Sequence, residues 1–190
     1  MFRSIFYILT FAGCLISLAM VRSPRLRQTL LLFASFGLYL TWTPWFTAVL
    51  LASVIMNFAV GKRLRRSPTW LPLTVGIVLN LSLLSVFKYL PEAALRLPFS
   101  SLQSLSHVAL PLGISFWTFQ AMSCLFDLYR DGELDPTFTE FAIYMAFFPV
   151  TISGPVCRMP DMLPQFRVEK LTSRNEILQG LRRIAIGGCQ

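Results

Sequence analysis

The side chains of this chain that could do chemistry are concentrated in one otherwise apolar run, Leu110–Arg130. The run reads LPLGISFWTFQAMSCLFDLYR and contains hydroxyls, an amide, a carboxylate and a guanidinium. On a helix, spacings of three and four residues place most of them on or near one face: Gly113, Phe116 or Trp117, Gln120, Ser123, Asp127 and Arg130. A polar stripe inside a membrane span usually faces a bundle interior or a cavity. The pattern is equally compatible with interhelical hydrogen bonding and with the lining of a substrate path.

Other patterns that would indicate catalysis are weak. His107 is the only histidine, and it is either a general base or simply a loop residue, with no carboxylate nearby in sequence. Asp127 and Arg130 could form no more than an ion pair at the membrane edge. The sequence shows no phosphate-binding glycine loop, paired histidine ligands or nucleophile elbow, so we predict no catalytic residue and no metal site. The four cysteines lack C-x-x-C spacing, and we interpret them as free thiols: Cys14, Cys124, Cys157 and Cys189.

The elements that must position these residues are membrane helices. Hydrophobic residues make up 55% of the 190 residues and charged residues only 14%. A soluble globular chain is about a quarter charged, so this composition excludes a solvated globule, a disordered chain and a disulfide scaffold. We therefore predict an all-α fold, a polytopic membrane helix bundle of about five or six transmembrane or re-entrant helices.

The uncharged segments give the expected spans, because a crossing helix needs about 20 apolar residues. They lie near 4–21, 28–43, 45–61, 69–90, 108–127 and 141–157. The first also imitates a signal peptide, but the arginines that follow it favour a membrane anchor. The second and third are separated by Pro44, which disfavours helix at the preceding residue. The last is interrupted by Pro149, Gly154 and Pro155, which predicts a short span or a re-entrant segment.

Basic residues predict how the bundle is oriented. Arg22, Arg25 and Arg27 follow the first span, and a second cluster, Lys62–Arg66, follows the third. Two antiparallel spans separate the clusters, so both lie on one side, which the positive-inside rule assigns to the cytoplasm. The net charge of +8 is explained by these clusters, which favour anionic lipid headgroups, and no nucleic-acid partner is expected.

Polar and small residues within the spans predict helix packing. Asn57 and Asn80 should form hydrogen bonds inside the bundle, and Gly113, Ala121 and Gly154 should let helices approach closely. After Arg158 the chain becomes more polar. Ser173 and Glu176 form a capping-box pattern that predicts an interfacial amphipathic helix from residue 173. The chain then stops without the polar end of a completed element, so we expect a truncated product.

Two long motifs in a fixed order carry a family resemblance. They are the run Leu110–Arg130 and FAIYMAFFPVTISGPVCRMPDMLPQF, Phe141–Phe166. Together with LLLFASFGLYLTW at 30–42 and FKYL at 87–90, they resemble the membrane-bound O-acyltransferase (MBOAT) family. The likeness is strongest to the bacterial branch that includes the membrane subunit of alginate O-acetylation. It covers nearly the whole chain.

The resemblance implies a multi-pass protein of the bacterial inner membrane. Such a protein moves an acyl group, typically acetyl, from a cytoplasmic thioester such as acetyl-CoA toward an extracellular polysaccharide such as alginate. It implies no bound cofactor, contacts with membrane lipid and an extracytoplasmic acetyltransferase as partner. Ser115, Gln120 and Asp127 match motif positions near the core, and Arg158 could hold an anionic part of the donor or anchor at the interface. These four are the candidate substrate-binding residues.

One departure from the family limits the functional expectation. Family members use an invariant histidine in a later half that this chain does not contain, and His107 matches no such position. We therefore expect the N-terminal part of an acyltransferase, which alone should not acylate anything. The alternatives are a non-catalytic membrane scaffold or assembly subunit and a small transporter. A transporter is disfavoured because the chain shows no internal repeat.

Overall fold

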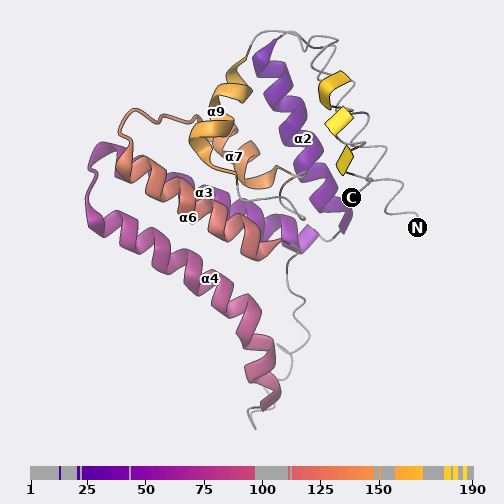
Figure 1. Cartoon of the computed structure of the whole chain (residues 1–190). Helices are drawn as coiled ribbons and strands as arrows, with labels where there is room; N and C mark the ends of the chain where they lie inside the picture. Colours follow the sequence, from indigo (N-terminus) through magenta and orange to yellow (C-terminus); the bar gives the residue numbers. More distant parts are fainter. Residues whose placement is uncertain are drawn as a thin grey trace.

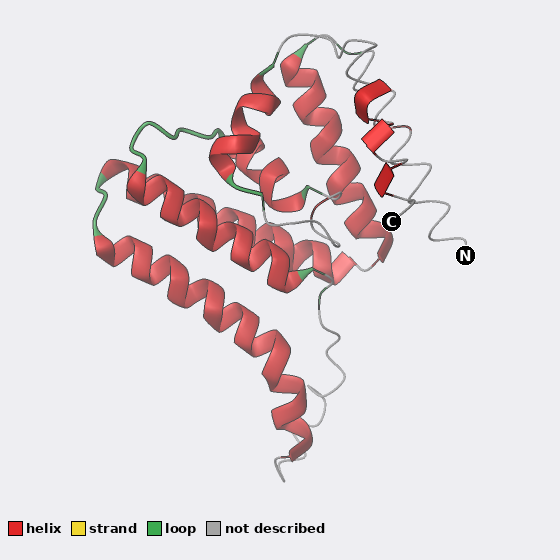
Figure 2. Cartoon of the chain, viewed as in Figure 1, coloured by secondary structure: helices red, strands yellow, loops and turns green. Residues whose placement is uncertain are grey.

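The structure is a computed structural model of the whole chain. It describes residues 23–42, 44–96, 113–147 and 157–168, together with positions 13, 21, 111, 150, 178–180, 182–183 and 186–187. These residues form helices and connecting loops, and none of them is in a strand (Figure 2). The all-α prediction is confirmed. The principal helices are α2 (Pro24–Trp42), α3 (Pro44–Arg66), α4 (Trp70–Arg96), α6 (Ile114–Arg130), α7 (Phe138–Ala146) and α9 (Met159–Arg167).

The helices α3, α6 and α4 lie side by side in Figure 1, with α4 at the edge of the bundle. Gly61 of α3 meets Leu128 of α6, so these two helices run parallel and end on the same side. The intervening helix α4 runs back along both. Within the described residues, α3 and the Trp70–Tyr89 part of α4 have the length and apolar composition needed to cross a membrane.

A buried amide pair joins α3 to α4. Asn57 Nδ2 donates to Asn80 Oδ1 at 3.2 Å, and Asn80 Nδ2 donates to Asn57 Oδ1 at 2.6 Å. Both side chains are fully buried. The expectation that these two residues bond inside the bundle is confirmed. An amide with no partner in apolar surroundings costs free energy, so the reciprocal pair fixes which faces of the two helices meet.

Glycines allow α3, α4 and α6 to approach one another closely. A Cβ at Gly61 would lie 2.9 Å from Cδ1 of Leu128, and a Cβ at Gly76 would lie 2.5 Å from Cδ1 of Leu125. The small residues expected to allow close packing were Gly113, Ala121 and Gly154. Of these, Ala121 is fully buried, whereas Gly113 adopts φ 75° where α6 begins, a conformation that favours glycine.

The helices α7 and α9 pack on α2 and α6. With 9 residues, α7 is about 14 Å long, too short to cross a membrane by itself. Its sequence is fully buried from Glu140 to Ala146. Several predicted features lie outside the described residues: the span 4–21 apart from two positions, His107, Gly154 with its flanking motif, and the capping box at 173–176.

Candidate functional site

The two motifs of the sequence meet in an ion pair between Asp127 and Arg158. Arg158 Nη2 donates to Asp127 Oδ1, which joins the end of α6 to the residue that caps α9. The Asp127 side chain is 2% exposed and the Arg158 side chain 55%. Asp127 Oδ2 is also buried, and it has no hydrogen-bond partner in the part of the chain that the structure describes. The site therefore has a deeply placed anion and a cation that reaches it from the surface.

A second set of hydrogen bonds holds the Arg158 segment against α6. The Tyr144 hydroxyl lies 2.9 Å from the Cys157 carbonyl oxygen and 3.2 Å from that of Gln120, either of which can accept its proton. In return, Gln120 Nε2 donates to the Tyr144 carbonyl at 2.9 Å. Gln120 and Tyr144 are buried, so these bonds form away from water and are geometrically restrictive. They place Cys157, and with it Arg158, beside Asp127.

A pocket opens at this ion pair. Its volume is about 230 Å³, and it is lined by Asp127, Arg130, Asp131, Arg158 and Pro160. Arg130 and Asp131 are exposed at its rim. Two guanidinium groups can bind an anionic ligand through paired N–H donors, the geometry that suits phosphate and carboxylate. In this pocket Asp127 already accepts one N–H of Arg158. The other N–H groups of the Arg158 guanidinium can donate to a ligand.

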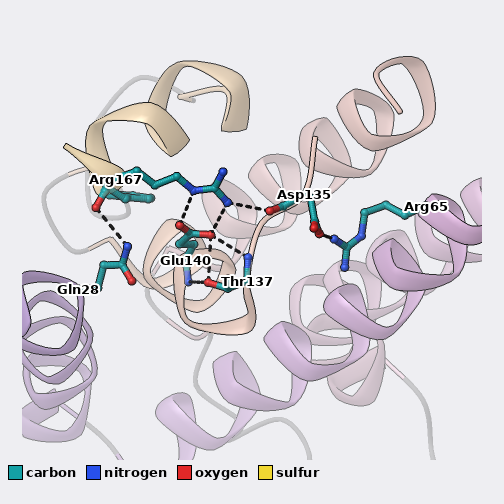
Figure 3. A network of polar contacts seen from close by, with 7 residues as sticks. Gln28, Arg65, Asp135, Thr137, Glu140 and Arg167 are labelled. Carbon is teal, nitrogen blue, oxygen red and sulfur yellow. Dashed lines mark hydrogen bonds and ion pairs between the residues drawn. The ribbon is translucent and has the colours of Figure 1, made fainter. Parts of the chain in front are cut away.

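A neighbouring network, shown in Figure 3, fixes α7 and α9 to each other. Arg167 Nε donates to Glu140 Oε1 at 2.7 Å, and its Nη2 donates to Glu140 Oε2 at 2.9 Å and to the Asp135 carbonyl at 2.8 Å. Thr137 completes a capping box with Glu140 at the start of α7. Arg65 of α3 pairs with the Asp135 side chain.

The charge state of Glu140 follows from this network. Burial alone would raise the pKa of Glu140, but the hydrogen bonds from Arg167 and Thr137 outweigh it, so the pKa lies below its usual value. The hydrogen bonds to Glu140 in turn raise the pKa of Arg167. Glu140 is therefore ionised at neutral pH. Both of its carboxylate oxygens accept hydrogen bonds from Arg167 or Thr137, which hold the side chain in one position.

The four predicted substrate-binding residues do not form one cluster. Asp127 and Arg158 are in contact, and Gln120 is linked to them through Tyr144. Ser115 lies about 18 Å from Asp127 along α6, on the partly exposed side of that helix. The residues of the predicted polar stripe also differ in burial. Trp117, Gln120 and Asp127 are buried, whereas Phe116 and Arg130 are exposed.

Sequence reasoning missed three residues of the site: Tyr144, Glu140 and Arg167. Thr137 and Glu140 carry the T-x-x-E pattern of a capping box, which was a usable signal. The sequence contained no signal for the partners of Tyr144 and Arg167, since these depend on how α7 and α9 pack. No group of three or more possible metal ligands occurs among the described residues.

Comparison with known proteins supplies a second, independent observation. The chain is 33% identical over 183 residues to the protein of Pseudomonas aeruginosa named "Probable alginate O-acetylase AlgI", and 32% identical over 177 residues to the protein of that name from Pseudomonas syringae pv. tomato. It is also 28% identical over 210 residues to the peptidoglycan O-acetyltransferase of Helicobacter pylori. The resemblance to bacterial membrane-bound O-acyltransferases is confirmed.

The extent of these matches differs between the chain and its relatives. They cover 87% of this chain but 34% of each of the two Pseudomonas proteins, and 93% of this chain but 38% of the Helicobacter protein. The chain thus spans about a third of the length of these O-acetylases. No protein-family model matches the chain, and no solved structure matches it.

Proposed function

We propose that this chain is the N-terminal part of a membrane-bound O-acyltransferase that passes an acetyl group across the inner membrane for O-acetylation of an extracellular polysaccharide. The observation that carries the proposal is the contact between the two family motifs. Asp127 of the first motif and Arg158 of the second, 31 residues apart, form one ion pair beside a polar pocket.

The position of the pocket fits a donor that arrives from the cytoplasm. α6 ends beside the basic end of α3, because the two helices run parallel. Arg27 and Gln28 at the start of α2 donate to Val168 and Phe166, so α9 lies near the other predicted cytoplasmic segment. The positive-inside rule assigns these basic ends to the cytoplasm.

Within this proposal, each residue of the site has a definite task. Arg158 binds an anionic part of a thioester donor such as acetyl-CoA while Asp127 orients its guanidinium. Gln120 and Tyr144 position the Arg158 segment, and they do not touch the donor. The histidine that the family uses for transfer would lie in the other two-thirds of a protein as long as the relatives. The contacts with an extracytoplasmic acetyltransferase would lie there as well.

Complementation tests the proposal. In a strain from which the gene is deleted, acetyl content of the surface polysaccharide is measured after return of the complete gene product, its Arg158→Ala variant or its Arg66→Ala variant. Arg66 is an exposed basic residue at the end of α3, outside the pocket, and serves as a matched control.

We expect acetylation to return with the complete product and with Arg66→Ala, and to fall by roughly 10- to 100-fold with Arg158→Ala, because a charge-assisted hydrogen bond contributes about 1.5–3 kcal/mol. The 190-residue chain alone should restore none. Unchanged acetylation in the deletion strain would contradict the proposal and favour a scaffold. Full activity of Arg158→Ala would remove the pocket from the mechanism.

A further inference from the structure

The helix α6 has a second face, opposite the one that carries the site. Its members follow one another at spacings of four, three, four and three residues: Ser115, Phe119, Met122, Phe126 and Tyr129. Phe119 is 51% exposed, Phe126 47% and Tyr129 38%, and the other two are partly buried. This is the spacing with which one helix meets another along a seam, here about 21 Å long. We refer to these five residues as the aromatic seam.

The aromatic seam differs in composition from the exposed face of α4. The middle of that face is mainly aliphatic and suits contact with lipid chains: Leu71, Val75, Val78, Leu79 and Leu81. Two aromatic residues, Trp70 and Tyr89, are exposed towards its ends, and Thr74, Ser82 and Ser85 are exposed as well. The seam instead combines phenylalanine, tyrosine and methionine, which are enriched where proteins meet. The seam therefore differs from the middle of the α4 face in its aromatic and methionine side chains.

The length of the relatives indicates what covers the seam. The O-acetylases that match this chain are about three times as long as the matched part, which leaves most of their length outside it. Meanwhile α6 is already packed by α3, α4, α7 and α9 on its buried side. Among the described helices, none is recorded on the exposed side of α6 that carries the seam.

We infer that the aromatic seam packs against a membrane helix from the part of the O-acetylase beyond the matched third. The contacting face of that helix should be rich in glycine, alanine and serine. Large aromatic side chains fill the space above small residues, and a hydroxyl or carbonyl there would satisfy Ser115. The inference rests on the proposed function, because the partner helix is taken from an O-acetylase.

Photo-crosslinking tests this inference. Phe126 is replaced by p-benzoylphenylalanine, which keeps an aromatic ring, in the complete gene product expressed in its own membranes. The same probe at Val78, which is 55% exposed on α4, is the matched control. After irradiation, the adducts are identified by mass spectrometry. A probe at Phe119 repeats the measurement in case the first variant does not accumulate.

We expect the Phe126 probe to attach to a peptide from a membrane helix that aligns with the O-acetylases outside the matched third. Its yield of protein adduct should exceed that of the Val78 probe by about tenfold or more, and the Val78 probe should attach to lipid. Lipid adducts alone at both Phe126 and Phe119, or adducts to a second copy of this chain, would overturn the inference. Acetyl content of the same cells is recorded in parallel, so loss of the seam contact and loss of the proposed activity are scored separately.

Discussion

Asp127 is the residue on which the site depends, because its carboxylate is buried and paired on one oxygen only. The attraction of Arg158 compensates the buried charge, while Oδ2 lies in the interior with no partner among the described residues. A buried charge that loses its partner is costly, whereas a neutral group of the same shape is much less so. Asp127 and Arg158 should therefore be strongly coupled in stability as well as in function.

Replacement of Arg158 by alanine should lower the free energy of unfolding, because it leaves the buried Asp127 carboxylate without its partner. The Asp127→Asn and Arg158→Ala double variant should be more stable than Arg158→Ala alone, since no buried charge remains. Thermal unfolding in detergent micelles measures both. Arg130→Ala, on the same pocket but exposed, is the control and should change stability by less than about 0.5 kcal/mol. Simple additivity of the two substitutions would contradict the pairing.

Glu140 predicts how stability depends on pH. Its pKa in the folded protein is lowered, so ionised Glu140 contributes stability above the unfolded-state pKa of about 4.3. That contribution is lost as the pH falls through the folded-state pKa. The stability difference between wild type and Glu140→Gln should be constant from about pH 6 to 8 and should shrink as the pH is lowered below about 4. Unfolding midpoints in micelles across this range measure it, and a difference that does not vary with pH would contradict the account.

Single residues also show which contacts could be predicted from the sequence and which could not. Hydrogen bonds of Asn57 and Asn80 inside the bundle could be predicted, because an amide in an apolar span needs a partner there, but their pairing with each other could not. The partner of Asp127 could not be identified. Arg130 lies one turn away, whereas Arg158 is 31 residues distant across an interrupted segment. Only the packing of α7 and α9 against α6 decides between the two arginines.

Among the helices, the contacts of α4 depend on glycine. A Cβ at Gly76 would come within 3.0 Å of Val60 Cγ1 as well as close to Leu125, so it would press on α3 and α6 at once. The sequence predicted that small residues would allow close packing, but the residues expected were Gly113, Ala121 and Gly154 and did not include Gly61 or Gly76. Neighbouring helices must be known before a glycine at a crossing can be distinguished from one on an open face.

Gly76→Ala should destabilise the protein by about 1–3 kcal/mol, because the added methyl group overpacks a closed contact. Gly37→Ala is the control. A Cβ at Gly37 meets nothing within 4 Å, and the change should stabilise α2 by up to about 1 kcal/mol, since alanine favours helix over glycine. Unfolding midpoints of the two variants should move in opposite directions. A stabilised Gly76→Ala variant would show that α4 does not pack as described.

The bounds of the helices could be predicted where the sequence contains a chain-breaking residue. The break between α2 and α3 lies at Pro44, and the all-helical class follows from composition. The segment from 141 is different, because its helix begins at Phe138 and ends at Ala146. Hydropathy marks apolar residues without distinguishing a crossing helix from a short helix that is buried by its neighbours. Here α7 is of the second kind.

Taken as a whole, the described part of the molecule has the basic end of α3, the pocket and the contact between the two motifs on one side. Arg63, Arg65 and Arg66 end α3, and α6 ends beside them at Arg130. Positive charge at the membrane surface attracts anionic lipid headgroups. Under the proposed function, the acyl donor would reach the Asp127–Arg158 pocket from the cytoplasm.

Membrane vesicles of known sidedness test this claim most directly. Labelled acetyl-CoA is supplied to inverted vesicles, whose cytoplasmic face is outward, and to right-side-out vesicles, and label transferred to glycan is measured with the complete gene product. We predict transfer in inverted vesicles only, with KM for the donor raised about 10- to 100-fold in Arg158→Ala and unchanged in Arg66→Ala. Transfer from donor on the outer face, or an Arg158→Ala variant with the KM of wild type, would contradict the account.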